Sequence, residues 1–166
     1  MTDVREQAAR IRLAVFDVDG VFTDGRLYYG SDGTELKAFH VRDGHGIKEL
    51  LRSGVQVAVI SGRESAAVAR RMRELGIEHV FQGCNDKLPV LETLLHQLGI
   101  AAQDIACVGD DTPDLPLIER AGLGIAVSDA HPSVRAAAQF TTRAPGGAGA
   151  VREVCDLILA ARTHGA

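Results

Sequence analysis

Residues 13–24 read LAVFDVDGVFTD and contain the first predicted strand and the first candidate site. Its apolar start contains β-branched and aromatic residues, the pattern of a buried strand. Two carboxylates, Asp17 and Asp19, follow where that strand should end, and Gly20 comes next. In an open parallel sheet, ligands bind beyond the carboxyl ends of the strands. Because aspartate and glycine are also common in turns, this stretch alone leaves a purely structural role open.

The rest of the chain alternates between strand-like and helix-like stretches. Further apolar strands are expected at residues 55–60, 79–82, 105–108, 123–127 and 140–142. The helical stretches between them end at glycines, such as Gly54, Gly76 and Gly99, as left-handed helix caps require. This alternation predicts an α/β fold, a Rossmann-like parallel sheet with helices on both faces.

Two segments interrupt that alternation. Strand-like runs flank residues 30–33, so we expect a β-hairpin inserted after the first strand, at about residues 25–41. Its aromatic residues need burial, either under the domain or against another subunit. A C-terminal tail at about residues 143–166 begins with a glycine-rich stretch, 143–150, that we expect to be a flexible loop. The whole chain, 1–166, is predicted to be one domain.

Composition excludes several classes of protein. At 166 residues the chain can bury a real core, and its net charge of −4 argues against a nucleic-acid binder. No apolar run is as long as a membrane span, and the N-terminus lacks the apolar core of a signal peptide. The three cysteines lack zinc-type spacing. We therefore expect a cytoplasmic protein with free thiols and without nucleic-acid or membrane partners.

Polar groups follow the ends of several predicted strands. They are Asp17, Asp19, Ser61, Gly62, Asp110, Asp111 and Asp114, and Lys87 begins a helix near the same edge. Clustered carboxylates repel one another unless a cation neutralises them, and their hard oxygens suit Mg²⁺. Ser61, the backbone N–H groups after it and Lys87 could hold an anion beside that cation. Taken singly, Ser61 could instead cap a helix and Lys87 could be an exposed helix lysine.

This combination is what phosphoryl transfer requires. Attack by Asp17 would form an aspartyl-phosphate and split one difficult displacement into two easier ones. Asp19 could protonate the departing alcohol and later deprotonate the attacking water. The metal ion and Lys87 would offset the charge that develops on the phosphoryl oxygens.

These residues resemble the four motifs of the haloacid dehalogenase superfamily of phosphatases, in order and setting. The resemblance implies that Asp17 is the nucleophile and that Asp19 is the acid/base whose backbone carbonyl also binds Mg²⁺. It further implies that Ser61, Gly62 and Lys87 bind the phosphoryl group. The implied metal ligands are Asp17, Asp19 and Asp110, with Asp111 and Asp114 behind them.

The resemblance extends to a group of capless, tetrameric phosphatases within the superfamily. It is carried by the hairpin and by residues 39–44, 60–63 and 145–153. It implies Mg²⁺-dependent hydrolysis of 3-deoxy-D-manno-octulosonate 8-phosphate in lipopolysaccharide precursor synthesis, by a homotetramer whose neighbouring subunits complete the site. Candidate contacts to the carboxylate or hydroxyls of the sugar are Arg63, Arg42 and Arg143.

Three other interpretations stay open to different degrees. The same scaffold would serve a phosphatase for a nine-carbon, sialic-acid-type sugar acid phosphate. Similar capless domains also occur as non-catalytic oligomerisation modules, although the intact pair Asp17 and Asp19 argues against that role. Dinucleotide binding is poorly supported, because residues 122–124 lack a third glycine and follow a helix instead of a strand.

Overall fold

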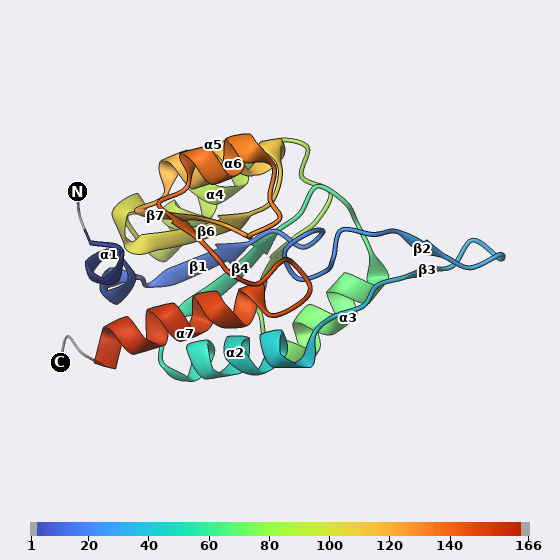
Figure 1. Ribbon diagram of the computed structural model, residues 1–166, viewed down its shortest axis with the longest axis horizontal. Helices are drawn as coiled ribbons and strands as arrows, with labels where there is room; N and C mark the ends of the chain where they lie inside the picture. Colours follow the sequence, from blue (N-terminus) through green and yellow to red (C-terminus); the bar gives the residue numbers. More distant parts are fainter. Residues whose placement is uncertain (1–2, 164–166) are drawn as a thin grey trace.

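The computed structural model describes residues 3–163, so the ends of the predicted 1–166 domain and of the predicted tail lie outside the described residues. Helices cover both faces of a parallel sheet (Figure 1). In the described part of the chain the sheet has six strands, in the order β5 (His79–Phe81), β4 (Gln56–Ile60), β1 (Leu13–Phe16), β6 (Ile105–Gly109), β7 (Leu123–Ala126) and β8 (Phe140–Thr141). The predicted α/β fold is confirmed.

Strand β1 lies inside this sheet and is buried along its whole length. Ala14 and Phe16 belong to one cluster of core residues, and Leu13 and Val15 belong to the other. The strand therefore contributes to the core on both faces, which explains why it reads as a continuous apolar run instead of alternating with polar residues.

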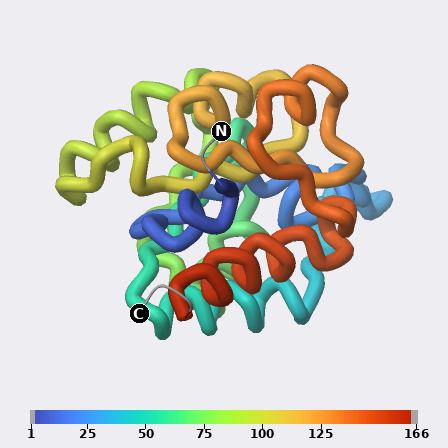
Figure 2. Tube along the Cα trace, turned by 60° about the vertical axis from the view of Figure 1, so that its left-hand side comes forward, coloured from blue at the N-terminus to red at the C-terminus, as the bar shows by residue number. Residues whose placement is uncertain are grey.

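The helices form the two outer layers. One face carries α2 (Val41–Arg52), α3 (Ala66–Leu75) and α7 (Ala150–Thr163), and the other carries α4 (Lys87–Leu98) and α5 (Leu115–Arg120) (Figure 1). Two further helices, α1 (Val4–Arg10) and α6 (Pro132–Ala137), complete the layers. Helix α7 lies along α2, as Figures 1 and 2 both show. None of the helices within residues 3–163 combines the length and apolar character needed to cross a membrane.

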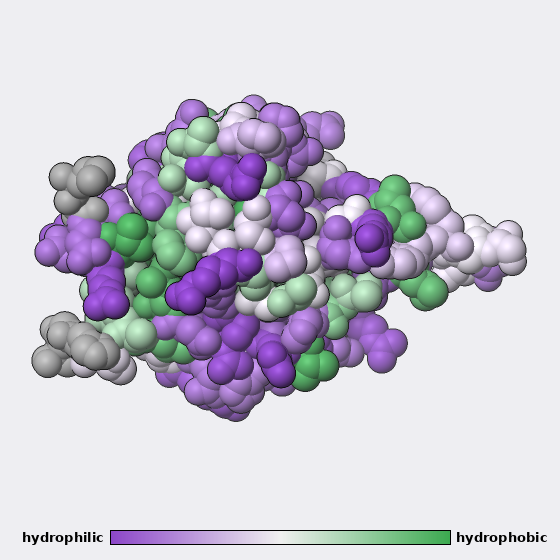
Figure 3. All heavy atoms as spheres, in the orientation of Figure 1, coloured by the Kyte–Doolittle hydropathy of each residue, from purple (hydrophilic) through white to green (hydrophobic). Residues whose placement is uncertain are grey.

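The predicted hairpin is present and projects away from the sheet (Figure 1). It pairs β2 (Tyr28–Tyr29) with β3 (Glu35–Leu36) in antiparallel fashion, so its strands are shorter than expected. Figure 3 shows apolar side chains among the polar ones on this arm. The exposed large apolar side chains of the described residues all lie here or just after it: Leu27, Tyr28, Tyr29, Leu36 and Val41.

The glycine-rich stretch after β8 differs from the flexible loop that we predicted. The backbone N–H of Gly147 donates to the carbonyl oxygen of Val21 over 3.0 Å. A Cβ atom at Gly146 would lie 1.8 Å from the carbonyl oxygen of Gly20. The glycines therefore let this loop pack directly on the loop after β1, where any side chain would clash.

Candidate active site

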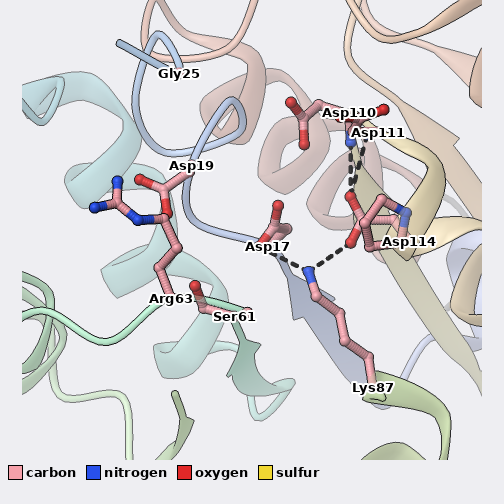
Figure 4. A pocket seen from close by; sticks show the side chains of 11 residues that line it. Asp17, Asp19, Gly25, Ser61, Arg63, Lys87, Asp110, Asp111 and Asp114 are labelled. Carbon is pink, nitrogen blue, oxygen red and sulfur yellow. Dashed lines mark hydrogen bonds and ion pairs between the residues drawn. The ribbon is translucent and has the colours of Figure 1, made fainter. Parts of the chain in front are cut away.

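A pocket of about 350 Å³ opens at the carboxyl ends of β1, β4 and β6 (Figure 4). The chain builds β4 and β5 on one side of β1 and then returns to place β6 on the other, which is where ligands bind in such sheets. The residues that line the pocket are Asp17, Asp19, Gly25, Ser61, Gly62, Arg63, Lys87, Asp110, Asp111, Pro113 and Asp114. Sequence reasoning singled out all of these except Gly25 and Pro113.

Lys87 is at the centre of the charged cluster. Its Nζ lies 2.9 Å from Asp17 Oδ1 and 2.7 Å from Asp114 Oδ1, and its side chain is 5% exposed (Figure 4). It is therefore not an exposed helix lysine. Burial lowers the pKa of the Lys87 ammonium, but Asp17 and Asp114 more than offset that effect, so the pKa is raised. Lys87 thus stays a fixed positive charge beside Asp17.

Asp114 orders the loop after β6. Its Oδ2 accepts hydrogen bonds from the backbone N–H groups of Asp110, at 3.0 Å, and Asp111, at 3.4 Å. The carboxylate of Asp111 in turn accepts from the N–H of Thr112, so it caps the short helix that starts there. Both oxygens of Asp114 are therefore engaged, one by Lys87 and the other by the backbone that carries Asp110.

The carboxylates of Asp17, Asp110 and Asp114 converge, with ligand atoms all within 4.8 Å of one another. Burial and then repulsion by Asp114 raise the pKa of Asp17 to about 6, although Lys87 lowers it. Burial and then the charges of Asp17 and Asp114 raise the pKa of Asp110 to about 8. Three carboxylates face one ammonium, so two negative charges remain without compensation when all are ionised. That balance fits a divalent cation with oxygen ligands.

Gly20 is required by the position of Asp110. Its φ is +88°, and a Cβ atom there would lie 2.0 Å from Asp110 Oδ2. A side chain at this position would therefore push the Asp110 carboxylate away from Asp17. The glycine that follows the two acids in the sequence thus makes room for a third acid from another strand.

Asp19 borders the pocket but lies outside that carboxylate cluster. Its Oδ1 accepts a hydrogen bond from Lys37 Nζ, which comes from the base of the hairpin. The Lys37 side chain is 2% exposed, and its Nζ also lies 3.1 Å from Glu35 Oε1. Sequence reasoning missed Glu35 and Lys37. Their spacing of two on a strand, which places both side chains on one face, is the signal that could have found them.

Ser61 and Gly62 follow β4 directly and line the pocket. The N–H of Ser61 donates to the carbonyl oxygen of Phe81 over 2.8 Å, and the residue is 2% exposed. Helix α3 begins only at Ala66, with Ser65 at its N-cap position. Ser61 therefore does not cap that helix, and its buried side chain is free for a role in the pocket.

The three candidate arginines are separated by the fold. Arg63 lines the pocket (Figure 4). Its Nη2 donates to Glu35 Oε2 over 3.0 Å. Within residues 3–163, neither Arg42 nor Arg143 is among the pocket residues. Arg143 follows edge strand β8, three strands away from β1, and its side chain is 97% exposed. Arg42 is exposed on the first turn of α2.

Known proteins are similar to this chain in both sequence and fold. Residues 80–152 match the model of the haloacid dehalogenase-like hydrolase family. The 3-deoxy-D-manno-octulosonate 8-phosphate phosphatase of Escherichia coli K12 is 51% identical over 160 residues, which are 96% of this chain and 85% of that protein.

Two solved structures agree over almost the whole chain. The 3-deoxy-D-manno-octulosonate 8-phosphate phosphatase of Yersinia pestis is 49% identical, with a TM-score of 0.96 over 98% of this chain and 88% of that one. The phosphatase of the same name from Moraxella catarrhalis, in complex with magnesium ion, phosphate ion and a KDO molecule, is 47% identical. Its TM-score is 0.96 over 99% of this chain and 94% of that one. The chain therefore belongs to the 3-deoxy-D-manno-octulosonate 8-phosphate phosphatase family of haloacid dehalogenase-like hydrolases.

Proposed function

We propose that this protein hydrolyses 3-deoxy-D-manno-octulosonate 8-phosphate to the free sugar acid and phosphate, with Mg²⁺ as cofactor, for lipopolysaccharide precursor synthesis. The observation that carries the proposal is the Asp17 carboxylate, held by Lys87 inside a buried acidic cluster at the strand ends. Membership of the phosphatase family supports the same substrate.

Asp17 is the proposed nucleophile. Lys87 binds Oδ1 of Asp17, which fixes the carboxylate at the carboxyl end of β1. With a pKa of about 6, Asp17 is mostly ionised at neutral pH even before a metal ion binds. Attack on phosphorus would form an aspartyl-phosphate and release the sugar alcohol. Lys87 would also offset the charge on the transferring phosphoryl oxygens.

Asp19 is the proposed acid and base. It lies two residues after the nucleophile and borders the same pocket. As an acid it would donate a proton to the departing sugar oxygen, and as a base it would then take a proton from the water that hydrolyses the aspartyl-phosphate.

The Mg²⁺ site is proposed at the carboxylates of Asp17 and Asp110 and the backbone carbonyl of Asp19. The raised pKa values of both carboxylates support it, because burial and repulsion between neighbouring carboxylates disfavour their charged forms, and a cation would relieve both effects. A bound Mg²⁺ neutralises charge on the carboxylates and on the phosphoryl group. Asp111 and Asp114 would support the metal ligands without binding the metal ion themselves, since Asp114 already binds Lys87 and the loop backbone.

The phosphoryl group and the sugar acid would be held by different residues. Ser61, Gly62 and Lys87 line the pocket around Asp17 and are proposed to bind phosphate. Arg63 Nη1 is buried without a hydrogen-bond partner among the described residues, so it is the best-placed group for the carboxylate of the sugar. Arg42 and Arg143 stay candidates for sugar contacts between subunits.

A homotetramer is proposed from the family resemblance and from the apolar hairpin. Tyr29 and Leu36 are each 62% exposed on this arm, and such patches commonly mark protein interfaces. A cytoplasmic location is proposed too. Cys84, Cys107 and Cys155 are free thiols, which suits a reducing compartment.

The test is phosphate release from a panel of sugar phosphates with Mg²⁺, with EDTA as the control. The panel contains the eight-carbon sugar acid phosphate, a nine-carbon sugar acid phosphate and a neutral hexose 6-phosphate. We expect preference for the eight-carbon acid and complete loss with EDTA. Preference for the nine-carbon acid would keep the chemistry but refute the substrate, and no turnover of any member would favour the non-catalytic module.

A further inference from the structure

Lys37 is a buried cation that the proposed chemistry does not yet use. It follows β3 at the base of the hairpin, and only 2% of its side chain is exposed. Its Nζ donates to Asp19 Oδ1 and lies 3.1 Å from Glu35 Oε1. A lysine is rarely this buried unless it is paired, and here both of its partners are carboxylates.

Glu35 extends this contact to Arg63, which lies beside Asp19 in the pocket (Figure 4). Its Oε2 accepts a hydrogen bond from Arg63 Nη2 over 3.0 Å. The charges thus alternate from Asp19 through Lys37 and Glu35 to Arg63. Hydrogen bonds from Lys37 and Arg63 lower the pKa of Glu35, so it stays ionised and holds Lys37 toward Asp19. Asp19 and Arg63 both line the pocket, so these ion pairs connect the hairpin base to two groups of the pocket wall.

We propose that Lys37 is a positioning residue for Asp19, the group that protonates the leaving alcohol. This inference rests on the proposed phosphatase function. Because Oδ1 of Asp19 already accepts a hydrogen bond from an ammonium group, the transferable proton is placed on Oδ2. Lys37 therefore selects which oxygen acts as the acid and holds the carboxyl group in one orientation at the pocket.

The proton balance of the two steps is simple. In the first, an oxygen of Asp17 bonds to phosphorus, the bond from phosphorus to the sugar oxygen breaks, and the Asp19 Oδ2 proton moves to that oxygen. In the second, water bonds to phosphorus, the bond to Asp17 breaks, and one water proton returns to Asp19. Lys37 keeps its own protons throughout and exchanges none.

A purely structural role would be to fasten the hairpin, and the nature of the leaving group separates the two roles. A sugar alcohol needs protonation as it departs, whereas 4-nitrophenolate leaves without a proton. The ratio kcat/KM reports the steps up to the first phosphoryl transfer. A misplaced Asp19 should therefore lower kcat/KM for the sugar acid phosphate and spare kcat/KM for 4-nitrophenyl phosphate.

The variant is Lys37→Met in the full chain with saturating Mg²⁺, beside Lys48→Met as a control, since Lys48 is an exposed lysine on α2. For Lys37→Met we expect kcat/KM to fall by about 10- to 100-fold for the sugar acid phosphate and by less than about threefold for 4-nitrophenyl phosphate. Lys37→Arg, which keeps a cationic donor, should recover part of the loss. Lys48→Met should match the wild type with both substrates.

A double-mutant cycle supplies a second measurement. If Lys37 acts through Asp19, adding Lys37→Met to Asp19→Asn should cost less than about threefold more in kcat/KM. Lys37→Gln replaces Lys37→Met if the latter does not fold, as judged by circular dichroism. Equal losses with both substrates, or additive losses in the cycle, would overturn the proposal while leaving the phosphatase function intact. Absence of turnover in the wild type would instead refute the function itself.

Discussion

The carboxyl ends of the strands and the hairpin both border the pocket, but they are held in place in opposite ways. At the strand ends, Asp17 and Asp114 are 11% and 4% exposed and lie among main-chain hydrogen bonds. On the hairpin, two-residue strands carry apolar side chains that are largely exposed, and ion pairs around the buried Lys37 attach its base to the pocket.

Sheet register positions the first region. Phe16 pairs with Val59 of β4 and Val108 of β6, and the N–H of Asp17 donates to the carbonyl oxygen of Val108 over 3.1 Å. The carboxylate therefore sits on backbone that the whole core stabilises. The hairpin lacks such support, since its apolar side chains are not buried within one chain. We infer that the strand ends determine the chemistry and that the hairpin determines assembly and orientation of the acid.

Substitution of the nucleophile should cause the largest loss of activity, and substitution of a carboxylate in the hairpin turn is its control. Asp17→Asn should lower kcat at least about 10³-fold, because an amide cannot form the covalent intermediate. Asp32→Asn, which alters only a turn on the arm, should leave kcat within about twofold. Phosphate release measures both. Substantial turnover by folded Asp17→Asn would remove Asp17 from the mechanism.

Substitution of two glycines, one at the strand ends and one on the hairpin, tests the same difference between the two regions. Gly20 and Gly33 have φ values of +88° and +84°, but only Gly20 faces a side chain, since nothing lies within 4 Å of a Cβ atom at Gly33. Gly20→Ala should displace Asp110 and weaken Mg²⁺ binding by at least about tenfold, as loss of support for a metal ligand typically does.

Gly33→Ala is the matched control for this strain. It should cost about 1 kcal/mol of stability for the positive φ and leave Mg²⁺ affinity unchanged. Isothermal titration with Mg²⁺ measures the affinity, and chemical denaturation measures the stability. Equal Mg²⁺ affinities for the two variants would show that Gly20 does not set the position of Asp110.

A charge on the hairpin surface should affect assembly and spare the strand ends. Leu36→Glu should weaken self-association at least about tenfold, because the new carboxylate would have to be buried in the interface. Hydrolysis of 4-nitrophenyl phosphate per chain should change little. Sedimentation velocity measures the assembly, with the volume-conserving Leu36→Met as control. An unchanged sedimentation profile for Leu36→Glu would mean that the hairpin surface is not the interface.

The smallest effect is the pH dependence of stability without metal. Folding raises the pKa of Asp17 to about 6 and of Asp110 to about 8, from a usual 3.8. Between about pH 4 and pH 8 the folded chain therefore holds more protons than the unfolded chain. The stability that comes from these two protonated carboxyl groups is fully present below about pH 4 and is lost as the pH rises toward 8. The hairpin carboxylates Asp32 and Glu35 have lowered pKa values and contribute with the opposite sign.

Thermal melts in EDTA at pH 5, 6.5 and 8 measure this loss. Mg²⁺ should raise the midpoint most at pH 8, where its ligands carry their charges. The Asp110→Asn variant, which cannot titrate at that position, should lose less stability between pH 5 and 8 than the wild type. A wild-type response identical to that of Asp110→Asn would contradict the assignment of the raised pKa to Asp110.

The contrast also explains which features the sequence could predict. The sequence predicts where each strand ends, because the apolar run stops there. The polar residue that follows must then lie at the edge of the sheet where ligands bind. Asp17, Ser61 and Asp110 meet at the pocket for that reason. The sequence does not predict which partners an individual carboxylate binds. Asp114, for example, binds Lys87 and the loop backbone.

The local sequence pattern does not predict the contacts of the hairpin. Glu35 and Lys37 read as ordinary polar strand residues, and only the folded arm shows that they meet Asp19 and Arg63. The prediction of a flexible glycine-rich loop is wrong for a related reason. Gly146 suggested flexibility, but it permits close packing against a segment more than a hundred residues earlier in the chain.

The most direct test of covalent catalysis by Asp17 is rapid quenching after the chain is mixed with substrate carrying a radiolabelled phosphoryl group. Asp19→Asn, which should slow hydrolysis of the intermediate, is used beside the wild type and Asp17→Asn. We predict acid-stable label on the protein in a peptide containing Asp17, more of it in Asp19→Asn, and none in Asp17→Asn. Label retained by Asp17→Asn, or absent from every variant while phosphate is still released, would contradict covalent catalysis at the end of β1.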